Sequence, residues 1–265
     1  MSRPELGINV QDLQLPTKTA LEKAAELDFR AIELPTVAGQ LAPSNLSKSG
    51  RRHLSHLVSS LGLRLAALVA DAPQLRLTDP QTVDQRVELT ASVLGLASDL
   101  KVPTVTAAVG ALTHPETKTP SPLAVEALKT IGEAADARGV FFCLRPSYDS
   151  GDRIVRVLDE LRCPSLGVCV DPAEQVMHGA NPFDSIDRFV EQVRLIHVRD
   201  GTAGLSDRTG HETRLGEGDV DLVGLLAILD AADYQGPHII RRTDSQNPAR
   251  DLSDARETLK HLLPP

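Results

Sequence analysis

Short apolar segments alternate with amphipathic segments along the whole chain. Eight apolar segments have the length and the bounding residues of buried β-strands: residues 6–10, 30–34, 63–68, 102–108, 140–144, 167–170, 193–198 and 238–240. The segments between and after them have the spacing of amphipathic helices: residues 17–27, 49–61, 82–100, 123–138, 151–161, 183–190, 222–232 and 252–263. Each predicted strand is therefore followed by a predicted helix.

Strict alternation of strands and helices predicts a parallel sheet. Eight such units within 265 residues fit a (β/α)₈ barrel better than an open sheet. An open, doubly wound sheet would carry a glycine-rich turn after its first strand, and residues 9–12, Asn-Val-Gln-Asp, contain none. Because no linker or shift in composition divides the chain, we expect one barrel domain over residues 1–265.

Composition narrows the range of partners. The net charge of −8 and the pI near 5.5 argue against a nucleic-acid-binding surface, and the absence of Trp makes base stacking improbable. No apolar run approaches the ~20 residues that a membrane span needs. The three cysteines lack metal-ligand spacing and no signal peptide is visible, so we expect reduced thiols and a cytoplasmic protein.

Polar side chains follow four of the predicted strands in the second half of the chain. They are Arg145, Asp171, His197 and Arg241. Active sites of (β/α)₈ barrels lie where the carboxyl ends of the strands meet, so these four side chains are candidates for one site. Residues two apart on a strand share a face, which places Cys143 and Cys169 deeper in the barrel, where we expect them to be structural.

The motifs around these strand ends are similar to those of a known family. Gly167-Val168-Cys169-Val170-Asp171, then His197-Val198-Arg199-Asp200 and residues 216–221, Gly-Glu-Gly-Asp-Val-Asp, occur in an order that resembles the xylose isomerase-like barrel superfamily. That group contains sugar isomerases, ketose epimerases, inosose-type dehydratases and endonuclease-IV-like nucleases. The resemblance covers nearly the whole chain and implies a (β/α)₈ barrel.

The resemblance also implies a divalent metal, held by Glu, Asp, His and Glu from the last four strands. Those positions fall on Arg145, Asp171, His197 and Arg241, so only the Asp and the His are retained. The family's frequent Asp-x-x-His substrate pair becomes Asp171 followed by Glu174. The charge at the four positions changes from −3 to +1 with neutral histidine, and guanidinium has no lone pair to offer a metal. We therefore expect no cofactor and disfavour Mn or Mg.

Two interpretations of the arginine pair are open. Planar guanidiniums recognise carboxylate or phosphate, which predicts a site for a small anionic, sugar-like molecule at Arg145 and Arg241. Alternatively, Arg145 pairs with Asp171 and Arg241 pairs with Glu33, leaving an inert core. For Asp200 we expect an ion pair at the rim. Further candidates to line the site are Asn9, Glu33 and Glu217, and the polar loop over residues 201–218 could close as a lid.

Three functions remain possible. In the first, an isomerase, epimerase or lyase without the metal abstracts a proton next to a carbonyl, with His197, Glu174 or Asp171 as the acid or base. In the second, a non-catalytic relative binds a small anion or a protein partner. In the third, a metal-dependent isomerase or epimerase recruits Glu174 and Glu217 as replacement ligands. The sequence leaves the substrate and the oligomeric state undefined.

Overall fold

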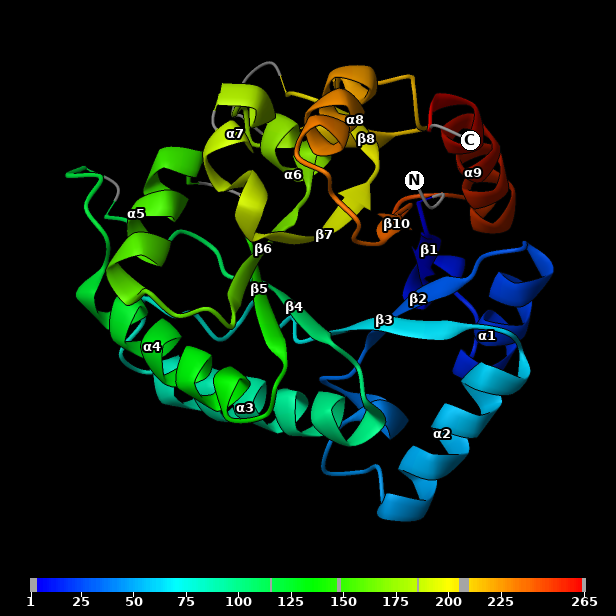
Figure 1. The fold of residues 1–265 in the computed structure, drawn as a ribbon, viewed down its shortest axis with the longest axis horizontal. Helices are drawn as coiled ribbons and strands as arrows, with labels where there is room; N and C mark the ends of the chain where they lie inside the picture. The colour runs from blue at the N-terminus through cyan, green and yellow to red at the C-terminus, as the bar shows by residue number, and fades with distance from the viewer. Residues whose placement is uncertain (1–3, 115, 147–148, 185, 205–209, 264–265) are drawn as a thin grey trace.

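Parallel strands close into a barrel in the computed structural model, which describes residues 4–114, 116–146, 149–184, 186–204 and 210–263 (Figure 1). The barrel strands are β1 (Leu6–Asn9), β2 (Ala31–Pro35), β3 (Arg64–Val69), β4 (Thr104–Ala108), β5 (Phe141–Arg145), β6 (Leu166–Val170), β7 (Val193–Val198) and β10 (His238–Ile240). Around the barrel each strand pairs with its neighbours in the chain, and β1 closes the ring by pairing with β10. This confirms the predicted (β/α)₈ barrel.

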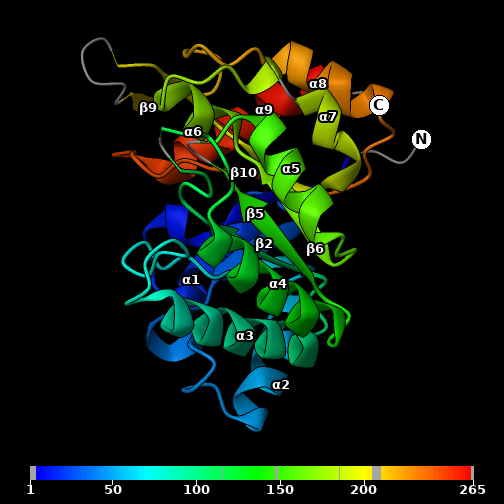
Figure 2. The ribbon, with the colours of Figure 1, turned by 90° about the vertical axis from the view of Figure 1, so that its left-hand side faces the viewer.

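Helices follow the strands and form the outer layer of the barrel (Figures 1 and 2). They are α1 (Thr17–Glu26), α2 (Lys48–Ser60), α3 (Val83–Leu100), α4 (Pro122–Asp136), α5 (Gly151–Leu161), α6 (Pro172–Met177), α7 (Ile186–Phe189), α8 (Leu222–Ala231) and α9 (Pro248–Leu262). Short 3₁₀ turns occupy Val10–Leu13, Gly39–Leu41, Pro182–Asp184 and Val190–Gln192. In the described part of the chain, no helix is both long enough and apolar enough to cross a membrane.

Two connections differ from the prediction. The single helix expected over residues 183–190 consists of short 3₁₀ and α segments, and α6 begins before it, directly after β6. Asp171 starts α6 because its side chain accepts a hydrogen bond from the Glu174 amide and Pro172 fits the first helical position. In the polar loop after β7, β8 (Asp200–Thr202) and β9 (His211–Thr213) form an antiparallel hairpin.

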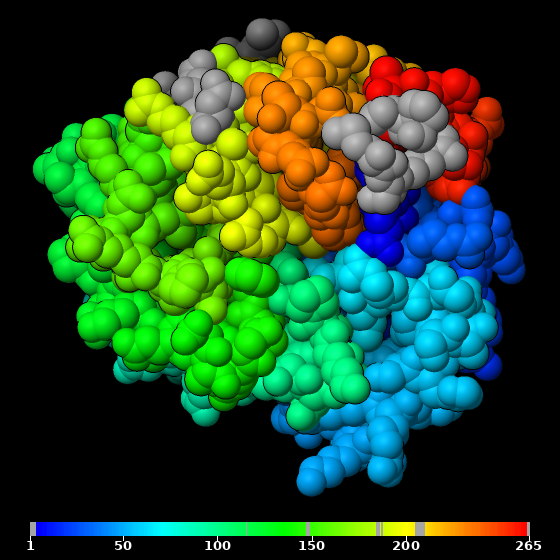
Figure 3. Space-filling model, in the orientation of Figure 1, coloured from blue at the N-terminus to red at the C-terminus, as the bar shows by residue number. Residues whose placement is uncertain are grey.

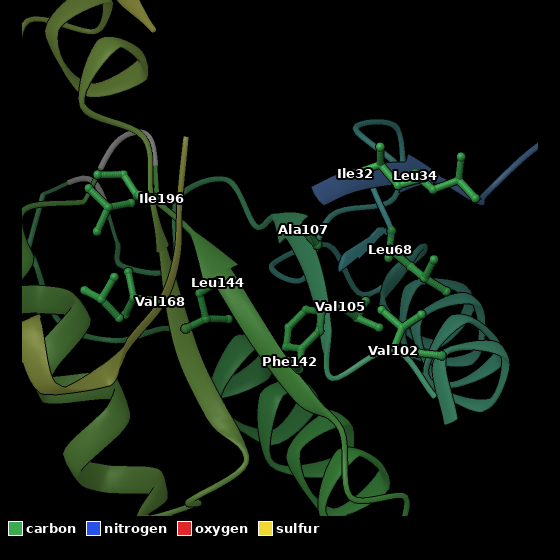
Figure 4. Close-up of a cluster of buried hydrophobic side chains, with 14 of the residues drawn as sticks. Ile32, Leu34, Leu68, Val102, Val105, Ala107, Phe142, Leu144, Val168 and Ile196 are labelled. Carbon is green, nitrogen blue, oxygen red and sulfur yellow. The ribbon is translucent and has the colours of Figure 1, made fainter. Parts of the chain in front are cut away.

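Large apolar side chains fill the space between the strands and the outer helices, as Figure 4 shows for residues of β2 to β7. A second apolar cluster consists mostly of small side chains: Ala31, Ala66, Ala67, Cys143, Cys169, Leu195 and Ile239. Gly7 shows how little room this inner cluster leaves, because a Cβ atom there would lie 2.6 Å from Ile239 Cδ1 and 2.7 Å from the Ala31 carbonyl oxygen. The barrel interior is therefore closed below the level of the polar strand ends.

Candidate functional site

A layer of polar side chains lies at the carboxyl ends of the strands, two residues beyond the small apolar cluster. Cys143 and Cys169 are fully buried, as predicted, and Arg145 and Asp171 follow each of them on the same face. The layer also includes Asn9, Glu33, Thr106, His197 and Arg241. The predicted strand-end residues thus come together at one mouth of the barrel.

His197 is at the centre of this layer, between two carboxylates. Its Nε2 lies 3.0 Å from Glu33 Oε2 and its Nδ1 lies 3.2 Å from Asp171 Oδ2. All three side chains are almost completely buried. Glu33 also accepts hydrogen bonds from Asn9 Nδ2 at 2.8 Å and from the Thr106 hydroxyl at 2.6 Å. Because each ring nitrogen faces a carboxylate oxygen, the arrangement favours a doubly protonated imidazolium.

The pKa values of these groups follow from the pairing. Burial by itself lowers the pKa of His197, but Cys169, Glu33 and Asp171 around the ring outweigh burial and hold it well above its ordinary value. Burial raises the pKa of Glu33, and His197 together with Arg241 outweighs that effect, so this pKa is lowered. The pKa of Asp171 is likewise well below its usual range, because Arg199 and His197 outweigh its burial. The three groups are charged together at neutral pH.

Arg145 pairs with Asp71, not with Asp171 as the inert alternative supposed. Its Nη2 lies 2.5 Å from Asp71 Oδ2, and Asp71 Oδ1 accepts the Ala108 amide at 2.7 Å. Asp171 is unavailable to Arg145 because Arg199 and His197 already occupy both of its oxygens. The Arg145 Nη1 atom is buried and has no hydrogen-bond partner among the described residues.

Arg241 is held by Asp12, which follows β1. Its Nε donates to Asp12 Oδ2 at 2.7 Å and its Nη2 donates to Oδ1 at 3.2 Å, a bidentate pair. The predicted approach to Glu33 is present but longer, with 3.7 Å between Arg241 Nη1 and Glu33 Oε2. Asp12 also accepts the backbone amide of Arg242 at 3.0 Å, so it fixes the chain after β10 as well as the guanidinium.

Arg199 joins the site to α6. Its Nε lies 3.0 and 3.1 Å from the two oxygens of Asp171, and its Nη2 pairs with Glu174 Oε2. The Glu174 side chain is 26% exposed, so it is the more accessible of the two acids that Arg199 holds. His178 Nδ1 lies 3.9 Å from the other Glu174 oxygen. Glu174 therefore lies at the edge of the network, where solvent reaches it.

Asp200 forms no ion pair with any other described residue, contrary to the expectation. Its carboxylate accepts backbone hydrogen bonds from Gly201, Gly216, Gly218 and Val220 at 2.9–3.1 Å. The Asp200 carboxylate leaves no room for a side chain at residue 218, because a Cβ atom on Gly218 would lie 2.3 Å from Asp200 Oδ1. Asp200 therefore organises the turn after β9, and Glu217 on that turn is exposed.

Glu212 fixes the β8–β9 hairpin to the loop that follows β10. Its carboxylate accepts hydrogen bonds from the backbone amides of Thr243 and Asp244, at 2.9 and 3.1 Å, and from the Thr243 hydroxyl. On its other side the hairpin packs on α6, where the Gly210 amide donates to the Met177 carbonyl at 2.8 Å. The hairpin thus connects α6, which follows β6, to the loop after β10, and the expected role of this loop as a lid stays a prediction.

A comparison with models of protein families shows to which family this chain belongs. The family model described as xylose isomerase-like TIM barrel matches residues 21–263. The chain belongs to this family. No curated protein matches it in sequence.

Solved structures with the same fold cover almost the whole chain. A xylose isomerase domain protein from Planctomyces limnophilus has 22% identity and a TM-score of 0.85, over 98% of this chain and 96% of that one. A D-tagatose 3-epimerase-like protein has 20% identity and a TM-score of 0.76, over 97% and 96%. A xylose isomerase-like TIM barrel protein from Mycobacterium smegmatis, in complex with magnesium, has 17% identity and a TM-score of 0.75, over 98% and 96%. At these identities the likeness shows the fold alone.

The side chains at the four positions implied for the family metal do not fit a divalent cation. Arg145 and Arg241 have no lone pair to donate. Asp171 accepts from Arg199 and His197, while both ring nitrogens of His197 face carboxylates. Among the described residues, no group of three His, Cys, Asp or Glu side chains could hold a metal ion. Loss of the metal itself stays a prediction.

Two residues essential to this arrangement were missed in the sequence. Asp12 and Asp71 are the partners of the two arginines; Asp12 lies in the 3₁₀ turn that follows β1, and Asp71 lies in the loop that follows β3. The signal that could have indicated them is a lone acidic residue shortly after a barrel strand, at the same end as the arginines. Among the described residues, the paired charged groups at the mouth are thus five carboxylates, on Asp12, Glu33, Asp71, Asp171 and Glu174, against three arginines and His197.

The pairing of His197 with Glu33 and Asp171 predicts how the free energy of unfolding depends on pH. The raised pKa of His197 gives stability that is fully present below its unfolded value, about 6.5, and is lost as pH rises through the folded pKa. The lowered pKa values of Glu33 and Asp171 give stability that is present above about pH 4 and is lost as pH falls through their folded values.

In the wild type, we expect the free energy of unfolding to fall by up to about 1.4 kcal/mol per pH unit above pH 6.5, because His197 loses its proton more easily in the unfolded state. In His197→Gln this part of the fall should be absent. Urea unfolding from about pH 4 to pH 9 measures the difference between the two proteins. Parallel curves for wild type and variant above about pH 6.5 would contradict a charged His197.

Proposed function

We propose that this protein binds a small anionic, sugar-like metabolite at the mouth of the barrel, without the divalent metal of its family. The observation that carries the proposal is the Arg145 guanidinium, which is buried and has one terminal nitrogen, Nη1, without a partner among the described residues. A buried N–H donor without an acceptor costs free energy, and an oxygen of a bound anion would satisfy it.

The surroundings of Arg145 support an exchangeable anion at this place. Its partner Asp71 exposes 35% of its side chain, whereas Asp12, the partner of Arg241, exposes 3%. A ligand carboxylate or phosphate can join or displace Asp71 without opening the core. Arg241, which Asp12 holds in place, then provides a fixed positive charge elsewhere at the mouth. The sugar-like character rests on relatives of the same fold that are described as a D-tagatose 3-epimerase-like protein and an L-ribulose 3-epimerase.

Binding is supported better than catalysis by the groups that surround the mouth. A general acid or base must reach its substrate proton by a hydrogen bond, and the polar atoms are already engaged: His197 contacts Glu33 and Asp171, and Asp171 also accepts from Arg199. This favours a relative that binds the anion without converting it.

The second candidate is an isomerase, epimerase or lyase that uses Glu174 as its base. The partial exposure of Glu174 and the nearby His178 ring favour it. Exchange of the substrate's α-proton in D₂O, followed by NMR on ketoses and sugar acids, measures this reaction. Wild-type exchange that Glu174→Gln abolishes would establish catalysis. A metalloenzyme with Glu174 and Glu217 as replacement ligands is disfavoured, because Glu217 is exposed and belongs to no group of three possible ligands among the described residues.

We expect gluconate and glucose 6-phosphate to raise the melting temperature, and neutral glucose to leave it unchanged. A ligand at 100 times its Kd adds about 2.7 kcal/mol of stability, which corresponds to several degrees in a barrel of this size. Scanning calorimetry at constant ionic strength measures the shift.

Arg145→Ala should abolish the shift relative to its own baseline. The matched control is Arg64→Ala, because Arg64 pairs with Glu5 at the half-exposed base of β3 and should leave the shift intact. If neither anion stabilises the wild type beyond the effect of sodium chloride, the arginines serve the fold alone and the proposed function is wrong.

A further inference from the structure

The solvent-facing side of α8 is unusually apolar for an outer helix of a barrel. Its exposed positions are Val223, Ala227, Asp230 and Ala231, so a single charge lies on this face. Val223 is 64% exposed, the largest value among the described large apolar side chains. Outer helices normally place polar side chains on this side, and an apolar helix face that water reaches indicates a surface covered by a partner.

A hollow runs alongside this helix, between α8 and α9. Its volume is about 490 Å³, and its apolar lining includes Val223, Leu226, Ala227, Leu262 and Leu263. Leu262 is 41% exposed, so two of the three exposed large apolar side chains in the described structure flank one hollow. Figure 3 shows that α8 (orange) and α9 (red) both reach the surface on this side of the molecule. The exposed face of α8 and this hollow together are called the α8–α9 face below.

We propose that the α8–α9 face joins two copies of this chain into a dimer. A projecting side chain, Val223, and a hollow lie next to each other on the same surface. Two copies related by a two-fold axis then place the Val223 side chain of each in the hollow of the other, which is the self-complementary arrangement that closed dimers use. The small residues Gly224, Ala227 and Ala231 let the two α8 helices approach closely.

The charges favour a second copy as the occupant. The chain has a net charge of −8, so most faces of two copies repel each other. The hollow between α3 and α4, for example, is lined by Asp84, Glu88 and Glu126. The ionisable side chains lining the α8–α9 hollow are instead Asp230, Tyr234, His238 and His261. A two-fold axis can set Asp230 of one copy against His261 of the other, so charge opposes association less at this face than at the hollow between α3 and α4.

The position of the face is compatible with the proposed function. The hollow is lined by Pro4, which precedes β1, and by His238, which begins β10. It therefore lies toward the end of the barrel where the strands begin, while Arg145 and His197 lie where the strands end. A dimer through α8 and α9 leaves the mouth of each copy open to its ligand.

Sedimentation velocity from about 1 to about 100 µM, a range that covers micromolar dissociation constants, measures the association. We expect a dimer in the wild type, with a dissociation constant that rises at least about 100-fold in Val223→Glu, because a carboxylate would be buried in an apolar hollow. Leu262→Glu, on the other wall, should have the same effect. Leu15→Glu is the control, since Leu15 is also 41% exposed but follows β1 at the opposite end of the barrel.

Two results would overturn the inference. A monomer at every concentration would mean that a different partner, or none, covers the face. A dimer that Val223→Glu and Leu262→Glu leave intact would place the interface elsewhere. Circular dichroism of each variant shows whether the fold is retained. Neither result bears on anion binding at Arg145, so this inference and the proposed function can fail separately.

Discussion

Glu33→Gln is expected to lower the free energy of unfolding by about 3–5 kcal/mol at pH 7, because removing one partner of a buried ion pair leaves a charge uncompensated. Glu33 is fully buried and accepts hydrogen bonds from Asn9, Thr106 and His197, with Arg241 close by. The amide keeps the shape and one acceptor oxygen but removes the negative charge that faces His197 and Arg241. Urea unfolding at pH 7 measures the loss.

The matched control is Glu5→Gln, which removes a carboxylate of the same kind from a partly exposed pair with Arg64. Ion pairs in contact with solvent contribute about 0–1 kcal/mol, so the two substitutions should differ several-fold. A loss below about 1 kcal/mol for Glu33→Gln would mean that the network is far less tightly coupled than its geometry indicates.

The sequence was sufficient to predict the barrel and to predict which strand residues point into its interior. Apolar segments of three to seven residues, each followed by a helical period, define the eight β/α units regardless of loop detail. Alternation along each strand then fixes which residues point inward, and this placed Cys143 and Cys169 correctly below Arg145 and Asp171. These inferences depend only on local periodicity and on the closure of parallel strands.

The partners of the charged residues could not be predicted in the same way. Asp12 lies in a short 3₁₀ turn and Asp71 lies in a loop, and the path of such connections is set by contacts that no periodicity encodes. Asp200 was assigned an ion pair because it follows an arginine, yet backbone amides of a turn 16–20 residues later satisfy it. Backbone donors are the same for every sequence, so composition gives no sign of them.

A double substitution can test whether Arg145 and Arg241 occupy the positions that the family resemblance implies for two glutamate ligands of a metal. Arg145→Glu combined with Arg241→Glu removes two of the four cations that face five carboxylates and adds two negative charges. Asp12 and Asp71 then lose their partners. Without metal we expect the double variant to lose more than the about 3–5 kcal/mol that one broken buried pair costs. The carboxylates would repel one another in a site largely shielded from water.

A divalent cation should reverse much of this loss, because the double variant places Glu, Asp, His and Glu at the carboxyl ends of β5, β6, β7 and β10. Mn²⁺ accepts oxygen and imidazole ligands, and a ligand that binds only the folded state stabilises it in proportion to its affinity. Calorimetric melting with and without Mn²⁺ should therefore show a large shift in the double variant and none in the wild type. Arg64→Glu, a charge reversal at the base of β3, controls for non-specific binding of the cation. A folded double variant that binds no Mn²⁺ would place Arg145 or Arg241 outside the positions that the family resemblance implies for the metal ligands.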